Sequence, residues 1–250
     1  MKQASSTTIF EYPLNEKIRM GLRLEYLLQH LFSPNPCTTD SQLLFFLQTL
    51  SVLLDILERY DARSDLLKAL ESQQQKLSHW SRQPGVDLSR LEQWQQQLSD
   101  SHNKLLAEAR LGQILRDDPL LSAVRQRLLL PSNSYPFDLP LLHGWLQQPT
   151  TQHNQQITTW LKFLKPLQQP LQLHLTLLRQ TVTFVQHQAV QGFYKGRTDN
   201  GFLLRLQIAK HLKLYPQISA HKNYFVISFF TEIDRAEKLP EQFFFGLACI

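Results

Sequence analysis

The sequence predicts an α+β protein in which a mainly helical domain, residues 14–188, precedes a small antiparallel β-domain, residues 189–250. Up to about Ala189, apolar residues recur every three or four positions, which is the period of an amphipathic helix. In the last 61 residues, which hold 11 of the chain's aromatic side chains, short apolar runs alternate with turn residues. The chain has 250 residues, enough for one large domain or two modest ones.

Helices are predicted in order along the first part of the chain. Asp40 and Asp87 precede apolar runs as candidate N-caps, and Asp118 is followed by Pro119, a residue that suits the first helical position. The breaks between helices fall at clusters of turn residues, 33–36, 83–85 and 131–134. The predicted helices span residues 14–32, 40–59, 63–80, 87–108, 119–130, 139–148, 153–165 and 169–188.

Strands are predicted in the second part of the chain, over residues 191–197, 202–208, 223–231 and 242–249. The dipeptide Asn200-Gly201 separates the first two strands and favours a tight hairpin between them. A sheet of only these four strands would need further elements packed against it or paired with it. Residues 7–12 have strand propensity and stop at Pro13, so they are a candidate additional strand of the C-terminal sheet.

The excess of positive over negative charge comes from one stretch of the chain. The whole chain has 26 Lys and Arg against 21 Asp and Glu, a formal net charge of +5. Residues 139–198 contain no acidic residue and supply the whole excess. A net positive charge favours polyanionic partners, so the alternative hypothesis is that the chain is a basic protein that binds nucleic acid. Dedicated nucleic-acid binding is not expected, because the sequence has no cluster of five Lys or Arg and no RNP-type aromatic motif.

Motifs of catalysis and of metal or nucleotide binding are missing. The chain contains neither G-x-x-x-x-G-K-[ST] nor G-x-G-x-x-G, the glycine-rich loops that bind nucleotide phosphates. It also lacks G-x-S-x-G and H-E-x-x-H, and its nine histidines do not have the spacing of metal ligands. The adjacent carboxylates Asp117 and Asp118 suggest acid–base or metal chemistry, but Asp118 already has a role as a helix cap. We therefore expect that the protein is not an enzyme and binds no cofactor or metal, although residues distant in sequence can still converge into a catalytic site.

The composition also bears on the compartment. Cys37 and Cys249 are far apart and have no metal or redox spacing, which fits a reducing environment. No apolar run reaches the roughly 18 residues of a membrane span, and the start of the chain lacks the apolar core of a signal peptide. We therefore expect a soluble, cytoplasmic protein without membrane insertion.

Polar residues on the first predicted helix form one stripe, because Glu16, Arg19, Arg23, Tyr26 and His30 follow one another at spacings of three and four. Two interpretations stay open. The stripe is either a solvated face on which Glu16 relieves the arginine pair, or an arginine fork beside an aromatic ring that binds carboxylates of a partner peptide.

A second basic group consists of Arg110, Arg116, Arg125 and Arg127. Two positions apart on a helix correspond to a rotation of about 200°, so Arg125 and Arg127 cannot both face one groove. His143 lies among apolar residues of its predicted helix. A histidine in that setting is more often packed or hydrogen-bonded than in contact with a ligand.

Distinctive short segments are spaced along nearly the whole chain. They are residues 10–19 (FEYPLNEKIR), 22–25 (LRLE), 53–59 (LLDILER), 84–87 (PGVD), 110–118 (RLGQILRDD), 124–127 (VRQR), 137–140 (FDLP), 192–194 (GFY) and 214–219 (LYPQIS). In this order they resemble the ZapD family of bacterial Z-ring-associated division proteins.

The resemblance implies a helical domain joined to a β-domain. It further implies a homodimer that binds the C-terminal tail of the tubulin-like protein FtsZ and bundles FtsZ protofilaments, which stabilises the Z-ring at the midcell division site. Members of this family are not enzymes, although they are associated with lowered FtsZ GTPase activity. The FtsZ tail is short, with acidic and apolar residues, and suits an arginine-lined groove with an aromatic or leucine wall.

What is known of the family places recognition on basic residues, and the matching positions in this sequence are Arg23 and His143. The charge pattern adds Arg19 and Arg116 as candidate neighbours. The sequence departs from the family at Pro119, where relatives have a further basic residue. We expect that this contact is lost or is supplied by Arg116 or Arg125.

Overall fold

The computed structural model describes residues 6–81, 87–108, 110–128, 139–198, 200–231 and 239–250. The chain forms two compact units. Met1–Leu22 and Thr176–Ile250 form the sheet unit, whereas Arg23–Leu175 forms the helical unit. The bounds of the units fall inside helix α1 (Glu16–Leu31) and helix α9 (Lys165–Gln180). The division into domains near residue 188 stays a prediction.

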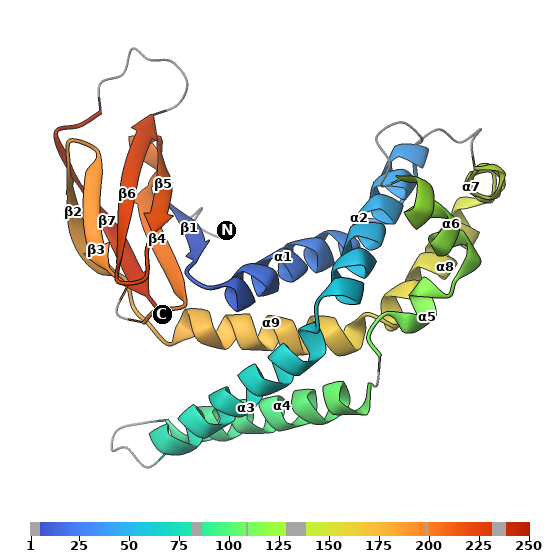
Figure 1. Cartoon of the computed structure of the whole chain (residues 1–250), viewed down its shortest axis with the longest axis horizontal. Helices are drawn as coiled ribbons and strands as arrows, with labels where there is room; N and C mark the ends of the chain where they lie inside the picture. The colour runs from blue at the N-terminus through green and yellow to red at the C-terminus, as the bar shows by residue number, and fades with distance from the viewer. Residues whose placement is uncertain (1–5, 82–86, 109, 129–138, 199, 232–238) are drawn as a thin grey trace. The chain divides into compact units, whose positions relative to one another are not determined.

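The helical unit contains the larger parts of α1 and α9 and the helices between them (Figure 1). Those helices are α2 (Asp40–Arg59), α3 (Ala62–Trp80), α4 (Leu88–Ala107), α5 (Gln113–Arg116), α6 (Pro119–Leu128), α7 (Pro140–Leu146) and α8 (Thr150–Lys162). They confirm the prediction of a mainly helical first part, and the short α5 is an addition that the sequence pattern did not predict.

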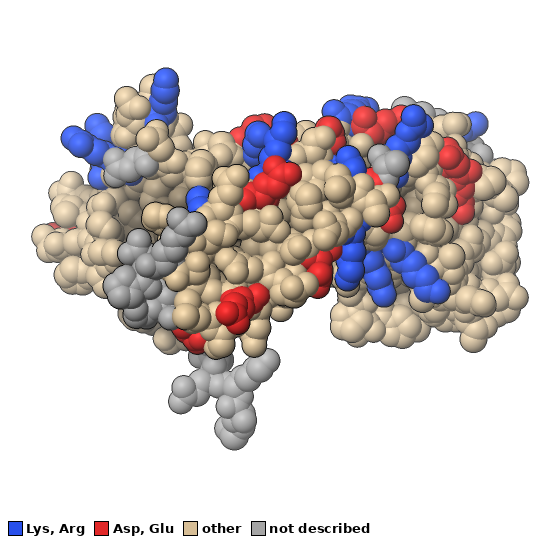
Figure 2. All heavy atoms as spheres, turned by 90° about the horizontal axis from the view of Figure 1, so that it is seen from below, with Lys and Arg blue, Asp and Glu red and all other residues tan. Residues whose placement is uncertain are grey.

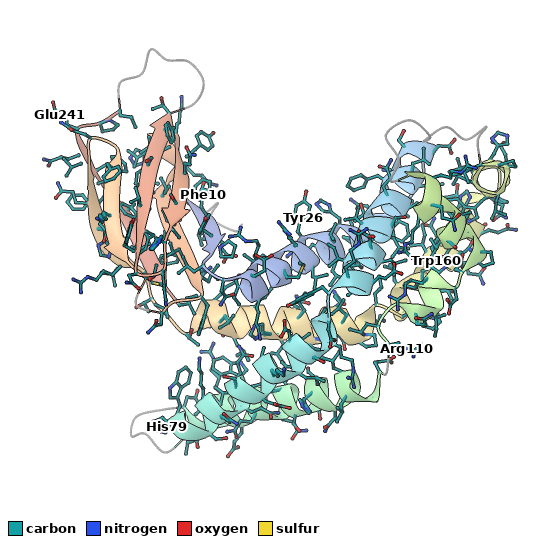
Figure 3. The ribbon with its side chains drawn as sticks, in the orientation of Figure 1. Phe10, Tyr26, His79, Arg110, Trp160 and Glu241 are labelled. Carbon is teal, nitrogen blue, oxygen red and sulfur yellow. The ribbon has the colours of Figure 1, made fainter. Side chains whose placement is uncertain are left out.

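Leucines at the helical period form the core of this unit. Leu47, Leu50 and Leu54 of α2 are fully buried, and burial of each such side chain contributes about 2 kcal/mol. Aromatic rings fill the space between α2 and α8, where Trp160 stacks on Phe46 with ring centroids 6.3 Å apart (Figure 3). The leucine periodicity thus predicts the buried face of α2 correctly.

Helices α3 and α4 lie side by side as an antiparallel hairpin (Figure 1). Gln73 of α3 is buried, and its Nε2 donates a hydrogen bond to the backbone oxygen of His174 in α9 at 3.0 Å. The ring Nδ1 of His174 is also buried and has no hydrogen-bond partner among the described residues. Burial, together with the charge of Lys76, lowers the pKa of His174 to about 4.

Two of the three predicted N-caps are confirmed. The carboxylates of Asp87 and Asp118 accept hydrogen bonds from the backbone N–H three residues on, at 3.2 and 3.0 Å. Asp40 as an N-cap is wrong, because Thr39 caps α2 in a capping box with Gln42. Asp40 instead occupies the first turn, where its charge interacts favourably with the helix N-terminus.

The last predicted helix, residues 169–188, is too long. Helix α9 ends at Gln180, and strand β2 (Val185–Val190) follows. All six residues of β2 pair with strand β7 (Gln242–Cys249). Residues 185–190 have the apolar spacing of a helix but form a strand, because their backbone groups make ladder hydrogen bonds with a strand that is more than 50 residues away in the sequence.

The sheet unit holds a seven-stranded antiparallel sheet in the order β1-β4-β7-β2-β3-β6-β5. Its remaining strands are β1 (Thr7–Pro13), β3 (Phe193–Arg197), β4 (Leu203–Ala209), β5 (Leu214–Ala220) and β6 (Tyr224–Thr231). Strand β1 pairs with β4 along its whole length, so the prediction that the N-terminal strand joins the C-terminal sheet is confirmed. Strands β2 and β5 were not predicted.

The predicted hairpin at Asn200-Gly201 is wrong, because β3 and β4 are not neighbours in the sheet. Strand β3 lies between β2 and β6, and β4 lies between β1 and β7. The tight turn that forms is Gln191-Gly192, which joins β2 to β3 with φ of 51° and 73°. Asn200 also has a positive φ, 60°, but the connection on which it lies joins strands that pair with other partners.

The inner face of the sheet forms the core of this unit. Alternate residues of the strands are buried there, including Leu206, Phe225, Phe229 and Phe245. Phe225 pairs with Gly196 on the neighbouring strand, and its ring occupies the space that a Cβ at Gly196 would need. Glycine at this position is therefore required for the close approach of the ring.

A charged network ties β1 to β4 and to the end of α9. Glu11 receives two hydrogen bonds from Arg179, at 2.9 and 2.7 Å, and one from Arg205 at 2.9 Å. Arg205 also donates to the backbone oxygen of Arg179 at 2.9 Å. Burial raises the pKa of Glu11, but the hydrogen bonds and charges of Arg179 and Arg205 outweigh it and hold that pKa below the ordinary value.

By length and composition alone, α2 is apolar enough to cross a membrane. The core helices of soluble proteins pass the same test. Eight residues of α2 are buried inside the helical unit, and the helix also carries the charged residues Asp55, Glu58 and Arg59 near its end. We therefore interpret α2 as a core helix.

Candidate functional site

The polar stripe predicted on the first helix lies on α1, and we call it the α1 stripe. Its last three residues belong to the helical unit and face solvent. Arg23, Tyr26 and His30 are all exposed, and Tyr26 projects from α1 with 61% of its surface accessible (Figure 3). The ring of Tyr26 lies edge-on to His30 at 4.5 Å, and His30 lies edge-on to Phe45 of α2 at 5.7 Å. The side chain of Arg23 has no hydrogen-bond, ion-pair or ring partner among the described residues, so its guanidinium is available to a ligand.

A depression of about 590 Å³ begins beside this aromatic row. His30, Phe45, Phe46 and Ile157 are among the residues that line it, and the lining includes no Asp, Glu, Lys or Arg. Neutral, partly apolar walls favour an apolar side chain over a charged one. The α1 stripe thus combines an available arginine with a place for an apolar residue of a partner.

Arg19, predicted as part of the same stripe, is held within the sheet unit. Its guanidinium lies 3.3 Å from Glu16, 5.7 Å from the ring centre of Tyr12 and 3.4 Å from the backbone oxygen of Pro13. These contacts occupy much of the donor capacity of the side chain. Arg19 therefore has a structural role that Arg23 lacks.

Four arginines surround a second depression of the helical unit, with a volume of about 430 Å³. We call it the arginine depression. Its charged lining consists of Arg59, Arg63, Arg110 and Arg116 together with Glu58 and Asp61. Four guanidiniums against two carboxylates leave a positive balance, which attracts acidic groups.

The arginines of this depression differ in how firmly they are held. Arg63 donates to the backbone oxygens of Leu105 and Leu106 at 3.2 and 2.8 Å. Arg59 pairs with Asp55 at 3.1 Å but keeps 78% of its side chain exposed. Arg110 is exposed on the segment between α4 and α5, and its side chain has no hydrogen-bond or ion-pair partner among the described residues (Figure 3).

Arg116 and Arg125, both predicted from the sequence, both act on the charge of Glu58, although only Arg125 contacts it. Arg125 donates to the Glu58 carboxylate at 2.5 Å. Arg116 donates to the backbone oxygen of Leu111 at 3.2 Å and to the side chain of Gln113 at 2.9 Å. The hydrogen bond and charge of Arg125 lower the pKa of Glu58, and the charges of Arg116 and Arg59 lower it further. These arginines therefore form one electrostatic group.

Gly112 shapes the wall of the arginine depression. It has a φ of 72°, a conformation that L side chains rarely adopt, and it caps the N-terminus of α5. A Cβ at this position would lie 3.0 Å from Leu54 of α2. Glycine thus lets the turn after Arg110 pack against α2, which places Arg110 and Arg116 at the same depression.

His143 is exposed on α7, although the sequence analysis favoured a packed histidine at this position. Leu142, Trp145 and Leu146 form the buried side of that helix. The packed histidine is His153, which contacts the Trp145 backbone oxygen at 2.7 Å. The side chain of His143 has no hydrogen-bond, ion-pair or ring partner among the described residues, so its imidazole is available to a ligand.

The charges of Arg116 and Arg125 both act on Glu58. Among the described residues, Arg19, Arg23 and His143 make no contact with these two arginines. Sequence analysis missed Phe45, Arg59 and Arg63. Arg59 and Arg63 lie about 50 residues before Arg110 in the sequence, so only the packing of α5 against the end of α2 reveals the group. The helical period placed Phe45 on α2 but could not show that its ring meets His30.

Other kinds of site find no support in the described part of the chain. No group of three or more His, Cys, Asp or Glu side chains could hold a metal ion there. On the face drawn in Figure 2, basic side chains stand in separate groups with acidic side chains among them. A nucleic-acid backbone is bound best by a continuous basic track.

Comparison with known proteins identifies the family. The family model ZapD, described as a cell division protein, matches residues 22–228. A cell division protein ZapD of Pectobacterium atrosepticum is 44% identical over 249 residues, which cover 100% of both chains. The ZapD proteins of Cronobacter sakazakii and Escherichia coli are each 44% identical over 241 residues, 96% of this chain and 98% of theirs.

This chain belongs to the ZapD family of cell division proteins. The resemblance stated above is thereby confirmed, and the protein acts in cell division. The region matched by the ZapD model includes Arg23, Arg116, Arg125 and His143 and excludes Arg19. It also contains the neutral depression beside His30 and the arginine depression, because all their lining residues lie between 30 and 161.

Proposed function

We propose that this ZapD-family protein binds the C-terminal tail of FtsZ and, as a homodimer, cross-links and bundles FtsZ protofilaments. It would act without enzymatic activity or cofactor, in the cytoplasm at the midcell division site, and would stabilise the Z-ring there. The observation that carries the proposal is the arginine depression of the helical unit, which offers exposed guanidiniums to an acidic peptide.

The chemistry of the arginine depression fits carboxylates. A guanidinium binds a carboxylate with two parallel hydrogen bonds, and such charge-assisted bonds are roughly twice as strong as neutral ones. Arg110 is exposed, and most of the Arg59 side chain is accessible. Arg116 and Arg125 are already anchored to Gln113 and Glu58, so they provide a fixed positive field while Arg59 and Arg110 contact the ligand.

The α1 stripe supplies the second kind of contact. Arg23 is available for a carboxylate, and the row of Tyr26, His30 and Phe45 leads to a neutral depression that suits an apolar side chain. The FtsZ tail, as the family resemblance implies, has acidic and apolar residues. We assign Arg23, Arg116, Arg125 and His143 to tail recognition, and Arg19 to the support of α1.

Bundling follows from multivalency. One weak tail site gives little binding, but a dimer that presents two sites to filaments with many tails gains avidity through effective concentration. A monomer with an intact tail site would bind tails without joining filaments.

Tail recognition can be tested by titration of a labelled FtsZ C-terminal peptide against the wild type and the variants Arg110→Glu, Arg23→Glu and His143→Ala. We expect Arg110→Glu and Arg23→Glu to weaken binding by about 10-fold to 100-fold, because each reverses a charge that faces the tail carboxylates. We expect a smaller loss for His143→Ala, because it removes an imidazole ring without reversing a charge.

Arg127→Glu is the matched control, because Arg127 is exposed on α6 but does not line either depression. If Arg127→Glu lost as much affinity as Arg110→Glu and Arg23→Glu, the loss would be explained by the change in net charge and not by the position of the residue. Unchanged binding in both Arg110→Glu and Arg23→Glu would refute the assignment of the site. Bundling of FtsZ that lacks its tail would refute the tail as the target.

A further inference from the structure

Basic side chains and two aromatic rings gather at one end of the sheet. We call Lys195, Arg197, His221, Lys222 and Tyr224 the sheet-end cluster; they come from the end of β3, the turn between β5 and β6, and the start of β6. Strand β6 lies between β3 and β5, so these three segments are neighbours in the sheet. All five residues are exposed.

Strand register brings the members of the cluster to one place. Arg197 pairs directly with Tyr224, and Lys195 lies two residues before Arg197 on the same side of β3. The ammonium group of Lys195 lies 4.8 Å from the ring centre of Tyr224. The ring of His221 stacks on the same tyrosine with ring centroids 5.3 Å apart. The tyrosine ring therefore joins the β3 part of the cluster to the turn.

A buried threonine fixes the turn beside the end of β3. Thr198 is only 4% exposed, and its backbone N–H donates to the backbone oxygen of Asn223 at 3.2 Å. Its hydroxyl donates to the backbone oxygen of Lys222 at 2.8 Å. The turn is closed by a hydrogen bond of 2.8 Å from the N–H of His221 to the backbone oxygen of Tyr224. The backbone that carries Lys222 is thus held next to β3, which keeps the positive charges of the cluster together.

The cluster has a positive charge that residues nearby in the sequence do not cancel. Lys195, Arg197 and Lys222 are cations, and residues 139–231 contain a single acidic residue, Asp199. The balance is therefore positive wherever that carboxylate lies. Among the described residues, the side chains of Arg197 and Lys222 have no hydrogen-bond or ion-pair partner. Their donor groups are available to an anionic ligand.

The form of the cluster favours an extended anionic surface over a small ligand or a nucleobase. A small ligand is usually bound in a concave site that buries most of it, whereas residues 219–224 are exposed without a break. A nucleobase needs an open aromatic face on which to stack, but Lys195 and His221 both lie against the ring of Tyr224. A fluid anionic surface needs neither a pocket nor an open ring.

A membrane that contains anionic lipids is such a surface. Each Lys or Arg near it strengthens binding by about 5-fold, so three cations together give about 100-fold. Tyrosine is enriched where headgroups meet water, because its ring is apolar and its hydroxyl is polar. Tyr224 lies among the cations with 42% of its surface exposed. The cluster therefore has both the charge and the ring that suit contact with anionic lipid.

We propose that the sheet-end cluster is a peripheral contact site for the phosphate headgroups of an anionic lipid surface. The contact is electrostatic and reversible, and no part of the chain crosses the membrane. It goes beyond tail recognition, because none of its residues lines the arginine depression or the neutral depression beside His30. A protein that binds tails through its helical unit and lipid through its sheet unit holds bundled filaments close to the membrane.

Flotation of the protein with lipid vesicles tests the inference. We expect the wild type to bind vesicles of phosphatidylglycerol mixed with phosphatidylcholine but not vesicles of phosphatidylcholine alone, and to bind less as salt is raised. Arg197→Gln combined with Lys222→Gln removes two cations and should weaken binding by about 25-fold. Lys195→Gln, which leaves the turn untouched, is a second, independent variant and should weaken binding by about 5-fold.

Lys210→Gln combined with Lys213→Gln is the matched control. These two exposed lysines precede β5, whereas the turn of the cluster follows that strand. The seven residues of β5 span about 23 Å, and physiological salt screens charges over about 8 Å. The control variant loses the same net charge as the first double variant, but its binding to the vesicles should change by less than about 2-fold.

Far-UV circular dichroism shows whether each variant keeps its fold, and the tail-peptide affinity of all variants should equal that of the wild type. A wild type that does not bind phosphatidylglycerol vesicles at low salt overturns the inference. Equal losses in the two double variants also overturn it, because net charge alone would then explain the binding. If a DNA oligonucleotide binds the wild type more tightly than the vesicles do, and Arg197→Gln with Lys222→Gln abolishes that binding, the cluster is a nucleic-acid site and the lipid assignment fails.

Discussion

Replacement of Glu11 by Gln tests the charged network of the sheet unit. Glu11 holds Arg179 with two hydrogen bonds and Arg205 with one, and only 19% of its side chain is exposed. Gln has the same shape but no charge, and its NH₂ group faces guanidinium donors. The change therefore removes the negative charge that two neighbouring guanidiniums contact.

The magnitude follows from the burial of the three side chains. Removal of one partner of a fully buried pair costs about 3–5 kcal/mol, because an unpaired charge is left behind. The exposed fractions of Glu11, Arg179 and Arg205 are 19%, 23% and 12%, so water screens part of this loss. We expect a cost of about 2 kcal/mol, which corresponds to a roughly 30-fold larger population of the open sheet.

Hydrogen exchange followed by mass spectrometry measures this opening locally. Amides of β1 and β4 should exchange about 30-fold faster in Glu11→Gln. All four tryptophans lie in the helical unit, so the urea transition followed by tryptophan fluorescence should change little. Because the pKa of Glu11 is lowered, its stabilisation is present above the ordinary value of 4.5 and is lost as the pH falls through the folded value. The difference between variant and wild type should therefore shrink at low pH.

Glu16→Gln is the control, because Glu16 pairs with Arg19 while 70% of its side chain is exposed. Exposed pairs contribute less than about 1 kcal/mol, so exchange in β1 and β4 should remain near that of the wild type. Equal exchange rates in Glu11→Gln and the wild type at neutral pH would refute the reasoning.

Two further predictions concern buried groups. The pKa of His174 is lowered to about 4, so its contribution to stability is complete above its unfolded value near 6.5 and falls by up to about 3 kcal/mol as the pH drops to 4. Urea unfolding followed by tryptophan fluorescence at several pH values should show this loss, and His174→Leu should remove it; an unchanged pH profile would contradict the burial argument. Gly196→Ala should destabilise the sheet unit by about 1–3 kcal/mol, because the new methyl group displaces the Phe225 ring. Hydrogen exchange in β3 and β6 measures the effect, and the same exchange rates as in the wild type would show that the ring can move without cost.

Much of the secondary structure could be predicted because its causes are local. The leucine period predicted the long helices, and Asp87 and Asp118 act as caps through hydrogen bonds to residues three positions away. The turn at Asn200-Gly201 shows the limit of such reasoning. Asn200 does have a positive φ, but the partners of β3 and β4 are decided by distant strands.

The candidate site could be predicted only in part. The charge pattern selected Arg116 and Arg125; Arg125 donates to Glu58, and the charges of both arginines lower the pKa of that carboxyl. It could not select Arg59, because the residues that surround the arginine depression come from segments that are far apart in the sequence. It also could not separate Arg19, which is held by Glu16 and the backbone of Pro13, from the available Arg23.

The sequence by itself determined the α+β class, the family, the exposed stripe of α1 and the candidate basic residues. These depend on the order, spacing and identity of residues, which the chain retains in any conformation. Tertiary structure decided the strand order, the arginines that remain available, and the basic side chains that gather at one end of the sheet. Those properties depend on which distant segments pack together, because burial and pairing are set by neighbours in space.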